Sequence, residues 1–244
     1  MTLQERTYNS IDRIREKSDS ALLFCSLGKD SLVLLDMLYP KFERIVCVFM
    51  FFVQHLEHID RWIGWVKARY PKIEFVEVPH WNLTYILRSG LYCVPNPKVK
   101  LLKLADVVKA MQLKYGIHYA FLGMKKADGM NRRLMLKGYE ANGYENNGMC
   151  YPLADWTQKD VLSYMKQHNL PERSKPVQAS DLTSIVCFGW KRTIRKTCNV
   201  FTKCFRFQSG YYGSIITNKT NRRKAELEVE TVEQESRRKH SMQE

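Results

Sequence analysis

The amino-acid sequence predicts an α/β fold, in which helices cover both faces of a doubly wound, mostly parallel, five-stranded sheet. Three observations lead to this class. Short apolar segments alternate along the chain with segments of helical periodicity. Residues 44–52 are apolar at nearly every position, as expected for a strand buried on both faces. A short polar turn separates the apolar run at 21–24 from an apolar helix at 32–38, which is typical of a strand that leads directly into a helix.

The first half of the chain supplies the elements of this sheet in alternating order. A helix is expected at 3–17, where apolar side chains recur on roughly one face. Three strand segments follow, separated by helices, and this order gives a doubly wound sheet with right-handed crossovers. We assign strands to residues 21–24, 42–53 and 73–78, and helices to residues 32–38 and 56–70.

The second half continues the pattern less regularly. Gly116 is a suitable C-cap for the helix that precedes it. Thr157 can cap a last helix together with Asp160, which is able to reach back to it, and this helix ends near Pro171. We assign helices to residues 82–91, 103–115 and 157–169 and a fourth strand to residues 117–124.

Length and charge divide the chain into three parts. Its 244 residues allow one large α/β domain at 1–175, an irregular, basic, cysteine-containing extension at 176–217, and a charged helical or disordered tail at 218–244. The formal net charge is +14, and the excess of positive charge lies at 98–137 and 191–206. This charge indicates either a solubilising surface or a basic rim for a polyphosphate nucleotide or a nucleic acid, DNA or RNA.

The sequence gives no sign of membrane insertion or secretion. The longest apolar run, residues 45–53, is too short to span a bilayer, and the first residues contain no apolar signal core. The seven cysteines are scattered and odd in number, unlike a disulfide framework. We therefore expect a cytoplasmic protein with no membrane partner.

The polar turn after the first strand is the strongest candidate for a binding site. A helix that starts there leaves backbone N–H groups unpartnered at the positive end of its dipole, which is favourable for an anion. Gly28 allows a phosphate to approach the backbone, Lys29 adds positive charge, and two serine hydroxyls can donate hydrogen bonds. The predicted phosphate-binding residues are Ser26, Leu27, Gly28, Lys29, Asp30 and Ser31.

This turn is not a Walker A loop, because Leu23 stands where the first glycine is required and Asp30 follows the lysine. It resembles the pyrophosphate-binding loop of the PP-loop ATP pyrophosphatases, Ser-Gly-Gly-x-Asp-Ser, with Leu27 in place of the first glycine. The form Ser-x-Gly-Lys-Asp-Ser is similar to the branch that contains the phosphoadenylylsulfate (PAPS) reductases. The resemblance implies a PP-loop, or HUP-like, fold.

Two further motifs extend the resemblance over about residues 20–171. PP-loop proteins of the sulfate branch end a strand with glycine followed by basic residues, a pattern that Gly123, Lys125, Lys126, Arg132 and Arg133 match loosely. Positioned cations of this kind stabilise the negative charge that develops when ATP is cleaved between its α and β phosphates. The string Pro-Leu-x-x-Trp-Thr-x-x-Asp-Val within residues 151–161 closely resembles the segment after the last core strand of PAPS reductases.

The resemblance implies an enzyme that binds ATP with Mg²⁺, or an adenylyl-sulfate nucleotide, and cleaves it at the α phosphate. Adenylylation with release of pyrophosphate would serve sulfur metabolism or the sulfur modification of a nucleic acid. Asp30 is the candidate magnesium ligand, and Gly123 joins the predicted nucleotide-binding residues. The predicted catalytic residues are Lys29, Asp30, Lys125, Arg132 and Arg133.

The sequence also departs from this family. The Glu-Cys-Gly-x-His string of true PAPS reductases is absent, so a thiol-dependent reductase stays an alternative, as does a non-catalytic nucleotide- or nucleic-acid-binding module. Cys187, Cys198 and Cys204 either bind an iron–sulfur cluster or are small core residues, and the lack of a close Cys-x-x-Cys pair favours the second interpretation. The sequence does not identify the acceptor substrate or a partner subunit.

The segment after the second predicted strand does not identify the nucleobase that would be bound. The family usually has an acidic-aromatic or Asp-Thr turn there, next to adenosine, whereas this chain has Val-Gln-His-Leu-Glu-His at residues 53–58. His55 and His58 have a metal-like spacing, but no third ligand is evident nearby, which favours two polar residues at a helix start.

Overall fold

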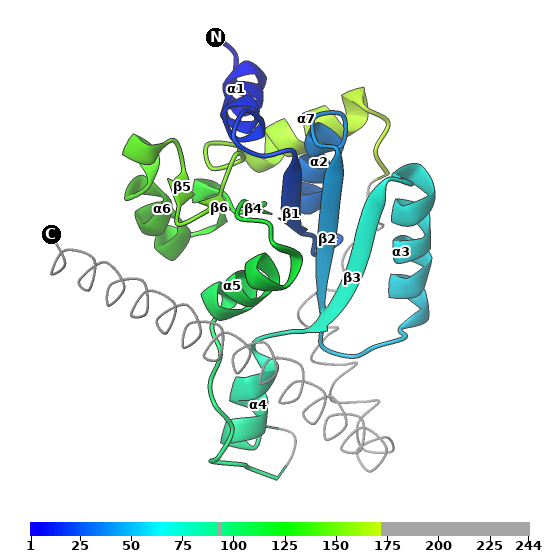
Figure 1. Cartoon of the computed structure of the whole chain (residues 1–244), viewed down its shortest axis with the longest axis vertical. Helices are drawn as coiled ribbons and strands as arrows, with labels where there is room; N and C mark the ends of the chain where they lie inside the picture. Colours follow the sequence, from blue (N-terminus) through cyan, green and yellow to red (C-terminus); the bar gives the residue numbers. More distant parts are fainter. Residues whose placement is uncertain (92–93, 172–244) are drawn as a thin grey trace, which may run out of the picture.

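The computed structural model of the chain describes residues 1–91 and 94–171. In this part, helices pack on both faces of a six-stranded sheet with the strand order β3-β2-β1-β4-β6-β5 (Figure 1). The predicted α/β, mostly parallel architecture is confirmed. The predicted extension at 176–217, the tail at 218–244, and Cys187, Cys198 and Cys204 lie outside the described residues.

Five strands of the sheet run parallel, and β5 pairs antiparallel with β6. The fourth predicted strand is shorter than expected. A sixth strand arises because Asn147 and Gly148, with φ of 49° and 77°, form a two-residue hairpin turn between β5 and β6. The strands are β1 (Ser20–Phe24), β2 (Arg44–Phe51), β3 (Ile73–Pro79), β4 (Ala120–Leu122), β5 (Glu145–Asn146) and β6 (Met149–Cys150).

The helices follow the predicted order. They are α1 (Leu3–Arg15), α2 (Lys29–Leu38), α3 (Glu57–Arg69), α4 (Leu83–Ser89), α5 (Leu104–Tyr115), α6 (Met130–Lys137) and α7 (Gln158–Gln167), with short 3₁₀ turns η1 (Lys126–Asp128) and η2 (Glu140–Asn142). Residues 125–133, to which the sequence analysis assigned no helix or strand, contain η1 and the start of α6.

Three helix ends have the caps that their sequences provide. The capping box of Thr157 and Asp160 at the start of α7 is confirmed, and Gly116 ends α5 in the left-handed conformation. Thr2 and Glu5 form a further capping box at the start of α1 that the sequence analysis did not assign.

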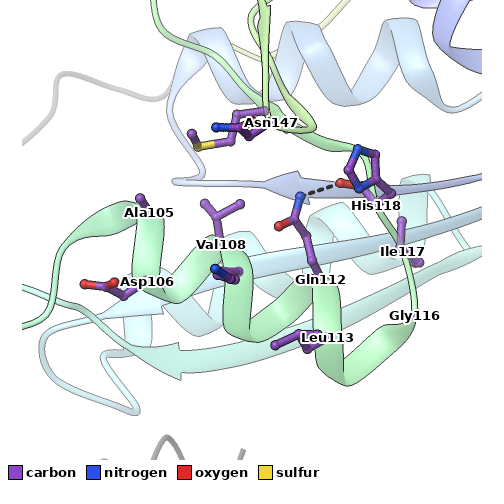
Figure 2. Close-up of a pocket in the computed structure, with 11 residues that line it drawn as sticks. Ala105, Asp106, Val108, Gln112, Leu113, Gly116, Ile117, His118 and Asn147 are labelled. Carbon is purple, nitrogen blue, oxygen red and sulfur yellow. Dashed lines mark hydrogen bonds between the residues drawn. The ribbon is translucent and has the colours of Figure 1, made fainter. Parts of the chain in front are cut away.

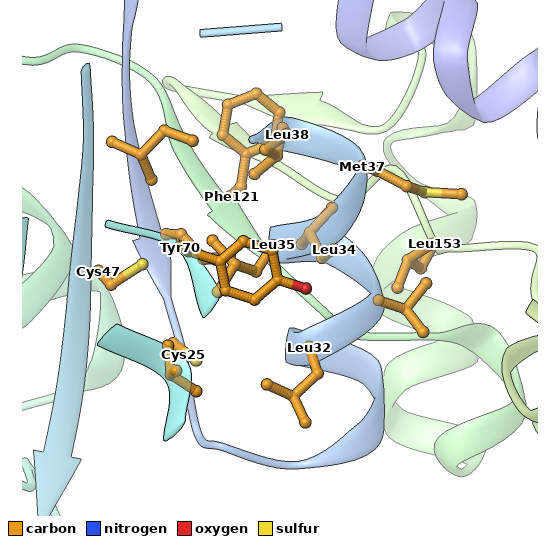
Figure 3. Packing of buried hydrophobic residues seen from close by; sticks show 14 of the residues in the cluster. Cys25, Leu32, Leu34, Leu35, Met37, Leu38, Cys47, Tyr70, Phe121 and Leu153 are labelled. Carbon is orange, nitrogen blue, oxygen red and sulfur yellow. The ribbon is translucent and has the colours of Figure 1, made fainter. Parts of the chain in front are cut away.

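Each face of the sheet carries its own hydrophobic core, which is the physical basis of the doubly wound arrangement. Consecutive residues of a strand point to opposite faces, and both are buried here: Leu23 belongs to the core under α1, α2, α3 and α7, whereas Leu22 belongs to the core under α5 and α6. Figure 3 shows α2 packed into the first core, to which Leu34, Leu38, Phe121 and Leu153 all belong. No helix among the described residues is long and apolar enough to cross a bilayer.

The strand order creates a topological switch point between β1 and β4, at the carboxyl edge of the sheet. From β1 the chain moves outward through β2 and β3, and then returns to place β4 on the other side of β1. Ligands of such sheets bind beyond the carboxyl ends of the strands, at the point where the order reverses. The turn at residues 26–31 follows β1 and residues 123–125 follow β4, so both predicted motifs lie at this point.

Candidate nucleotide-binding site

The loop between β1 and α2 leaves the first turn of α2 open to an anion. Gly28 is the N-cap of α2 and provides no side-chain cap, in contrast to Thr157 of α7. Within the described part of the chain, the backbone N–H groups of Lys29, Asp30 and Ser31 have no hydrogen-bond acceptor. Unpartnered N–H groups at a helix start are suited to a phosphate or sulfate group.

The two serines of the loop differ in what they can offer a ligand. Ser31 is buried, and its hydroxyl donates a 2.9 Å hydrogen bond to the carbonyl of Gly28, so it holds the loop in shape. Ser26 is exposed, lies 3.3 Å from the Ser31 hydroxyl and accepts a long hydrogen bond from the Gly28 N–H. Ser26 is thus the hydroxyl of this pair that faces solvent.

Leu27 occupies the position of the missing family glycine in an unusual conformation. Its φ is 59°, in the left-handed region that residues with a side chain seldom adopt, and its side chain is fully buried. Burial of the leucine side chain offsets the backbone strain. The loop therefore keeps the backbone path that a glycine would provide, although the residue has changed.

A buried ion pair links the loop to the end of β4. Lys125 is only 2% exposed, and its Nζ lies 2.7 Å from Asp30 Oδ1 and 3.0 Å from Asp128 Oδ1. Both Asp30 Oδ1 and Lys125 Nζ are buried, and neither has a hydrogen-bond partner among the described residues. The contact is therefore an ion pair with two carboxylates. Lys29 also contacts Asp30, at 3.4 Å.

Gly123 makes this pairing possible. A β-carbon at this position would lie within 3.4 Å of Asp30 and Ser31, at the first turn of α2. The glycine therefore allows the end of β4 to lie directly against the loop, and Lys125 follows two residues later.

The two predicted arginines lie on α6, away from these contacts. Arg132 is half-buried and Arg133 is exposed. Within the described residues, no hydrogen bond or ion pair joins either guanidinium to the loop, and the charge of Arg132 acts instead on the hydroxyl of Tyr151. The structure thus brings Lys29, Asp30, Lys125 and Gly123 together and leaves the arginines at the periphery.

Sequence reasoning missed an aromatic cluster at the carboxyl ends of β2 and β3. The rings of Phe52 and His80 stack with centroids 4.3 Å apart, and Trp81 lies beside His80. Phe52 is 43% exposed, so it presents a ring to solvent at the same edge of the sheet as the loop. The available signal was an aromatic residue directly after each of two neighbouring parallel strands.

His80 is uncharged at neutral pH. Burial lowers the pKa of its imidazole to about 4, and its Nδ1 accepts a hydrogen bond from the Asn82 N–H at 3.1 Å, so its Nε2 carries the proton. His55 and His58 are both exposed. Among the described residues there is no group of three or more His, Cys, Asp or Glu side chains placed to hold a metal.

The described thiols are structural. Cys25, Cys47 and Cys150 are unpaired and buried, and burial raises the pKa of each. They are therefore neutral thiols, which are poor nucleophiles and poor metal ligands.

A cavity of about 780 Å³ lies elsewhere, between α5 and the β5–β6 turn. Figure 2 shows Gln112 and His118 on one wall, joined by a hydrogen bond, with Asn147 opposite. Residues 116–118 line it and precede β4, so it extends to the amino edge of the sheet. It contains none of the loop residues.

The fold and the loop define a nucleotide-binding α/β protein of the PP-loop type. A family model for the phosphoadenosine phosphosulfate reductase domain matches residues 20–187, which is more than half of the chain. The chain therefore belongs to the phosphoadenosine phosphosulfate reductase domain family, and the predicted enzyme family is confirmed.

Curated relatives are similar over the same region. The chain is 25% identical over 159 residues to an adenosine 5'-phosphosulfate reductase of Geobacillus thermodenitrificans (strain NG80-2). This alignment covers 64% of this chain and 67% of that protein. It is 25% identical over 163 residues to one of Staphylococcus haemolyticus (strain JCSC1435), covering 64% and 65%. The chain spans about two thirds of the length of these relatives.

Two solved structures are weakly similar in fold. One is an NH3-dependent NAD synthetase from Campylobacter jejuni, with a TM-score of 0.46 and 13% identity over 86% of this chain and 96% of that one. The other is a phosphoadenylyl-sulfate reductase from Candida auris, with a TM-score of 0.46 and 14% identity over 70% and 82%. The family assignment rests on the family model and not on these two structures.

Proposed function

We propose that this chain binds an adenine nucleotide, either ATP or an adenylyl sulfate, and cleaves it at the α phosphate. The buried Lys125 ammonium group is the observation that carries this proposal. It lies beside Asp30 at the start of α2 and has no hydrogen-bond partner among the described residues. A buried cation next to unpartnered N–H groups fits the terminal phosphate or sulfate of such a nucleotide.

In the proposed reaction, an oxygen of an acceptor attacks the α phosphorus of ATP. The bond from this phosphorus to the bridging oxygen breaks, the acceptor is adenylylated and pyrophosphate leaves. The amides of residues 29–31, together with Lys29 and Lys125, stabilise the charge that develops on the leaving group. Arg132 and Arg133 would have to approach from α6 to contribute.

A resident magnesium ion does not fit the side chains at this place. Asp30 already faces the ammonium groups of both Lys29 and Lys125, which occupy the position that a cation would need. Magnesium ions prefer several oxygen ligands. A magnesium ion that enters with ATP, held by its phosphates, belongs to the substrate.

A second candidate function is the thiol-dependent reduction of the sulfonucleotide, which the names of the curated relatives favour. This reaction needs a thiolate to attack the sulfur of the bound nucleotide. The described thiols at positions 25, 47 and 150 are buried and neutral, so the candidates are the cysteines outside the described residues, which are Cys93, Cys187, Cys198 and Cys204.

The test is calorimetric titration of the full chain with ATP, adenosine 5'-phosphosulfate and its 3'-phosphorylated form. Lys125→Met should weaken binding about 10- to 100-fold, since a hydrogen bond to a charged group contributes roughly 1.5–3 kcal/mol. Lys137→Met, at an exposed position of α6, is the charge-matched control and should bind normally. If the wild-type chain binds none of the three nucleotides, the proposal is wrong.

The two reactions are then separated by their products. Pyrophosphate release from ATP, measured with sulfate, tRNA or DNA as acceptor, supports adenylylation. Release of sulfite from a sulfonucleotide in the presence of a dithiol, abolished by substitution of Cys93, Cys187, Cys198 or Cys204, supports the reductase. Binding without either product identifies a non-catalytic nucleotide-binding module.

A further inference from the structure

Lys126, the neighbour of Lys125, is held in a separate polar cluster. Its Nζ lies 2.8 Å from the Tyr144 hydroxyl, 2.9 Å from Asp155 Oδ1 and 3.3 Å from Glu140 Oε1. The Tyr144 hydroxyl also contacts both Asp155 oxygens at 2.8 Å. The ammonium group therefore joins η1 to the chain around η2 and to the segment that follows β6.

The two lysines occupy different environments although they are adjacent in sequence. Lys125 reaches Asp30 of α2, whereas Lys126 reaches Tyr144 and Asp155. The backbone supports this division, because the Lys126 N–H donates a 2.8 Å hydrogen bond to the Ala154 carbonyl. The Lys126 side chain and its backbone thus attach the same turn to residues 154–155, at two points.

The charges of this cluster are matched. Burial alone lowers the pKa of the Lys126 ammonium group, but its contacts with Tyr144 and Asp155 outweigh burial and leave the pKa raised. Burial raises the pKa of the Asp155 carboxyl group, but the hydrogen bonds from Lys126 and Tyr144 hold it below its usual value. Lys126 is therefore charged at neutral pH and balances a carboxylate near the turn that carries Lys125.

We propose that Lys126 is a positioning residue, which fixes the turn at 125–128 so that Lys125 meets the nucleotide. This inference rests on the proposed function. Lys125 is held by contacts to Asp30 and Asp128, and Asp128 lies in the same short turn. If the turn moves, both partners of the ammonium group shift relative to each other. Small displacements of a binding group have large effects on affinity and rate.

Removing Lys126 also changes the electrostatics. Asp155 and Glu140 lose the cation that they share, and their uncompensated charge then opposes the approach of a nucleotide anion. Tyr144 and Asp155 also line a cavity of about 250 Å³ beside α1, so water can reach this cluster. The protein is therefore expected to fold without the Lys126 side chain, which makes the substitution informative.

The experiment is a titration of the full chain with adenosine 5'-phosphosulfate and with ATP, together with thermal unfolding of each variant. We expect Lys126→Met to weaken binding about tenfold, which corresponds to roughly 1.4 kcal/mol and lies within the range of coupling between contacting groups. Lys126→Arg keeps the charge and should recover most of the affinity. Lys137→Met should bind like the wild type.

A double-mutant cycle separates positioning from general destabilisation. Asp155→Asn weakens the same ion pair by changing the partner of Lys126. The loss of nucleotide affinity caused by Lys126→Met should therefore be smaller in the Asp155→Asn background than in the wild type. Lys126→Met with wild-type affinity would overturn the inference, and so would additive effects in the cycle. If Lys126→Met does not fold, an unchanged nucleotide affinity of Asp155→Asn would also overturn the inference.

These results are distinct from a failure of the proposed function. Absence of nucleotide binding by the wild-type chain contradicts the proposed function itself. Normal binding by the wild type and by Lys126→Met contradicts only the positioning role. Loss of affinity in Lys126→Met that Lys126→Arg does not recover, at an unchanged melting temperature, also contradicts it, because the charge would then not be what matters.

Discussion

Gly123 and Asp30 lie so close together that a β-carbon on the glycine would be 3.2 Å from the carbonyl carbon of the aspartate. This contact joins the end of β4 to the first turn of α2, although the two residues are far apart in the sequence. It sets the distance at which Lys125 meets the loop. The absence of a side chain at position 123 is therefore a requirement of the candidate site.

Gly123→Ala should weaken nucleotide binding severalfold and lower stability by about 1 kcal/mol, because the added methyl group pushes β4 and α2 apart. Calorimetric titration and urea unfolding measure the two effects. Gly64→Ala in α3 is the matched control, since a β-carbon there meets nothing within 4 Å. That control should be stabilised by about 0.5–1 kcal/mol. Equal behaviour of the two variants would refute the role of Gly123.

Leu27→Gly restores the glycine of the family loop. The substitution relieves a positive φ but removes a fully buried side chain, so we expect a net loss of about 1–3 kcal/mol in the free energy of unfolding. Nucleotide affinity should change less than threefold, because the backbone path is kept. A large loss of affinity with intact folding would show that the leucine side chain itself shapes the binding site.

The carboxylate of Asp36 on α2 contacts two other parts of the fold, the end of α3 and the helix α7 with its C-cap. It accepts hydrogen bonds from the hydroxyls of Tyr70 at 2.9 Å and Tyr164 at 3.1 Å, and His168 Nδ1 lies 3.2 Å away. We expect Tyr164→Phe to lower the free energy of unfolding in urea by about 1 kcal/mol. Tyr85→Phe, at an exposed site, should have almost no effect. Identical midpoints for the two variants would count against a stabilising cluster.

His80 should make stability depend on pH. Its pKa in the folded chain is about 4, below the ordinary value of 6.5, so the unfolded chain takes up the proton first as the pH falls. The free energy of unfolding should therefore decrease between pH 6.5 and 4. In His80→Asn, which can keep an acceptor for the Asn82 N–H, this decrease should be smaller. Melting temperatures at pH 7 and 5 measure the difference, and parallel profiles would contradict it.

Several features of the protein follow from the sequence alone because they depend on local interactions. The buried strands are visible in their apolar runs, the start of α2 in the turn that ends at Gly28, and the cap of α7 in Thr157 and Asp160. These patterns were sufficient for the fold class and the family, and they predicted the loop that we propose binds the phosphate.

Other features were decided only by the tertiary structure. Lys125 and Lys126 are chemically identical neighbours, and the sequence does not say which one reaches Asp30. The contact of Gly123 with α2, and the hydrogen bond from the Lys126 N–H to the Ala154 carbonyl, determine which lysine reaches Asp30. Similarly, Phe52 and His80 meet because β2 and β3 are neighbours in the sheet. Local patterns fix a residue's backbone, whereas the partner of a side chain depends on which distant segments the sheet brings together.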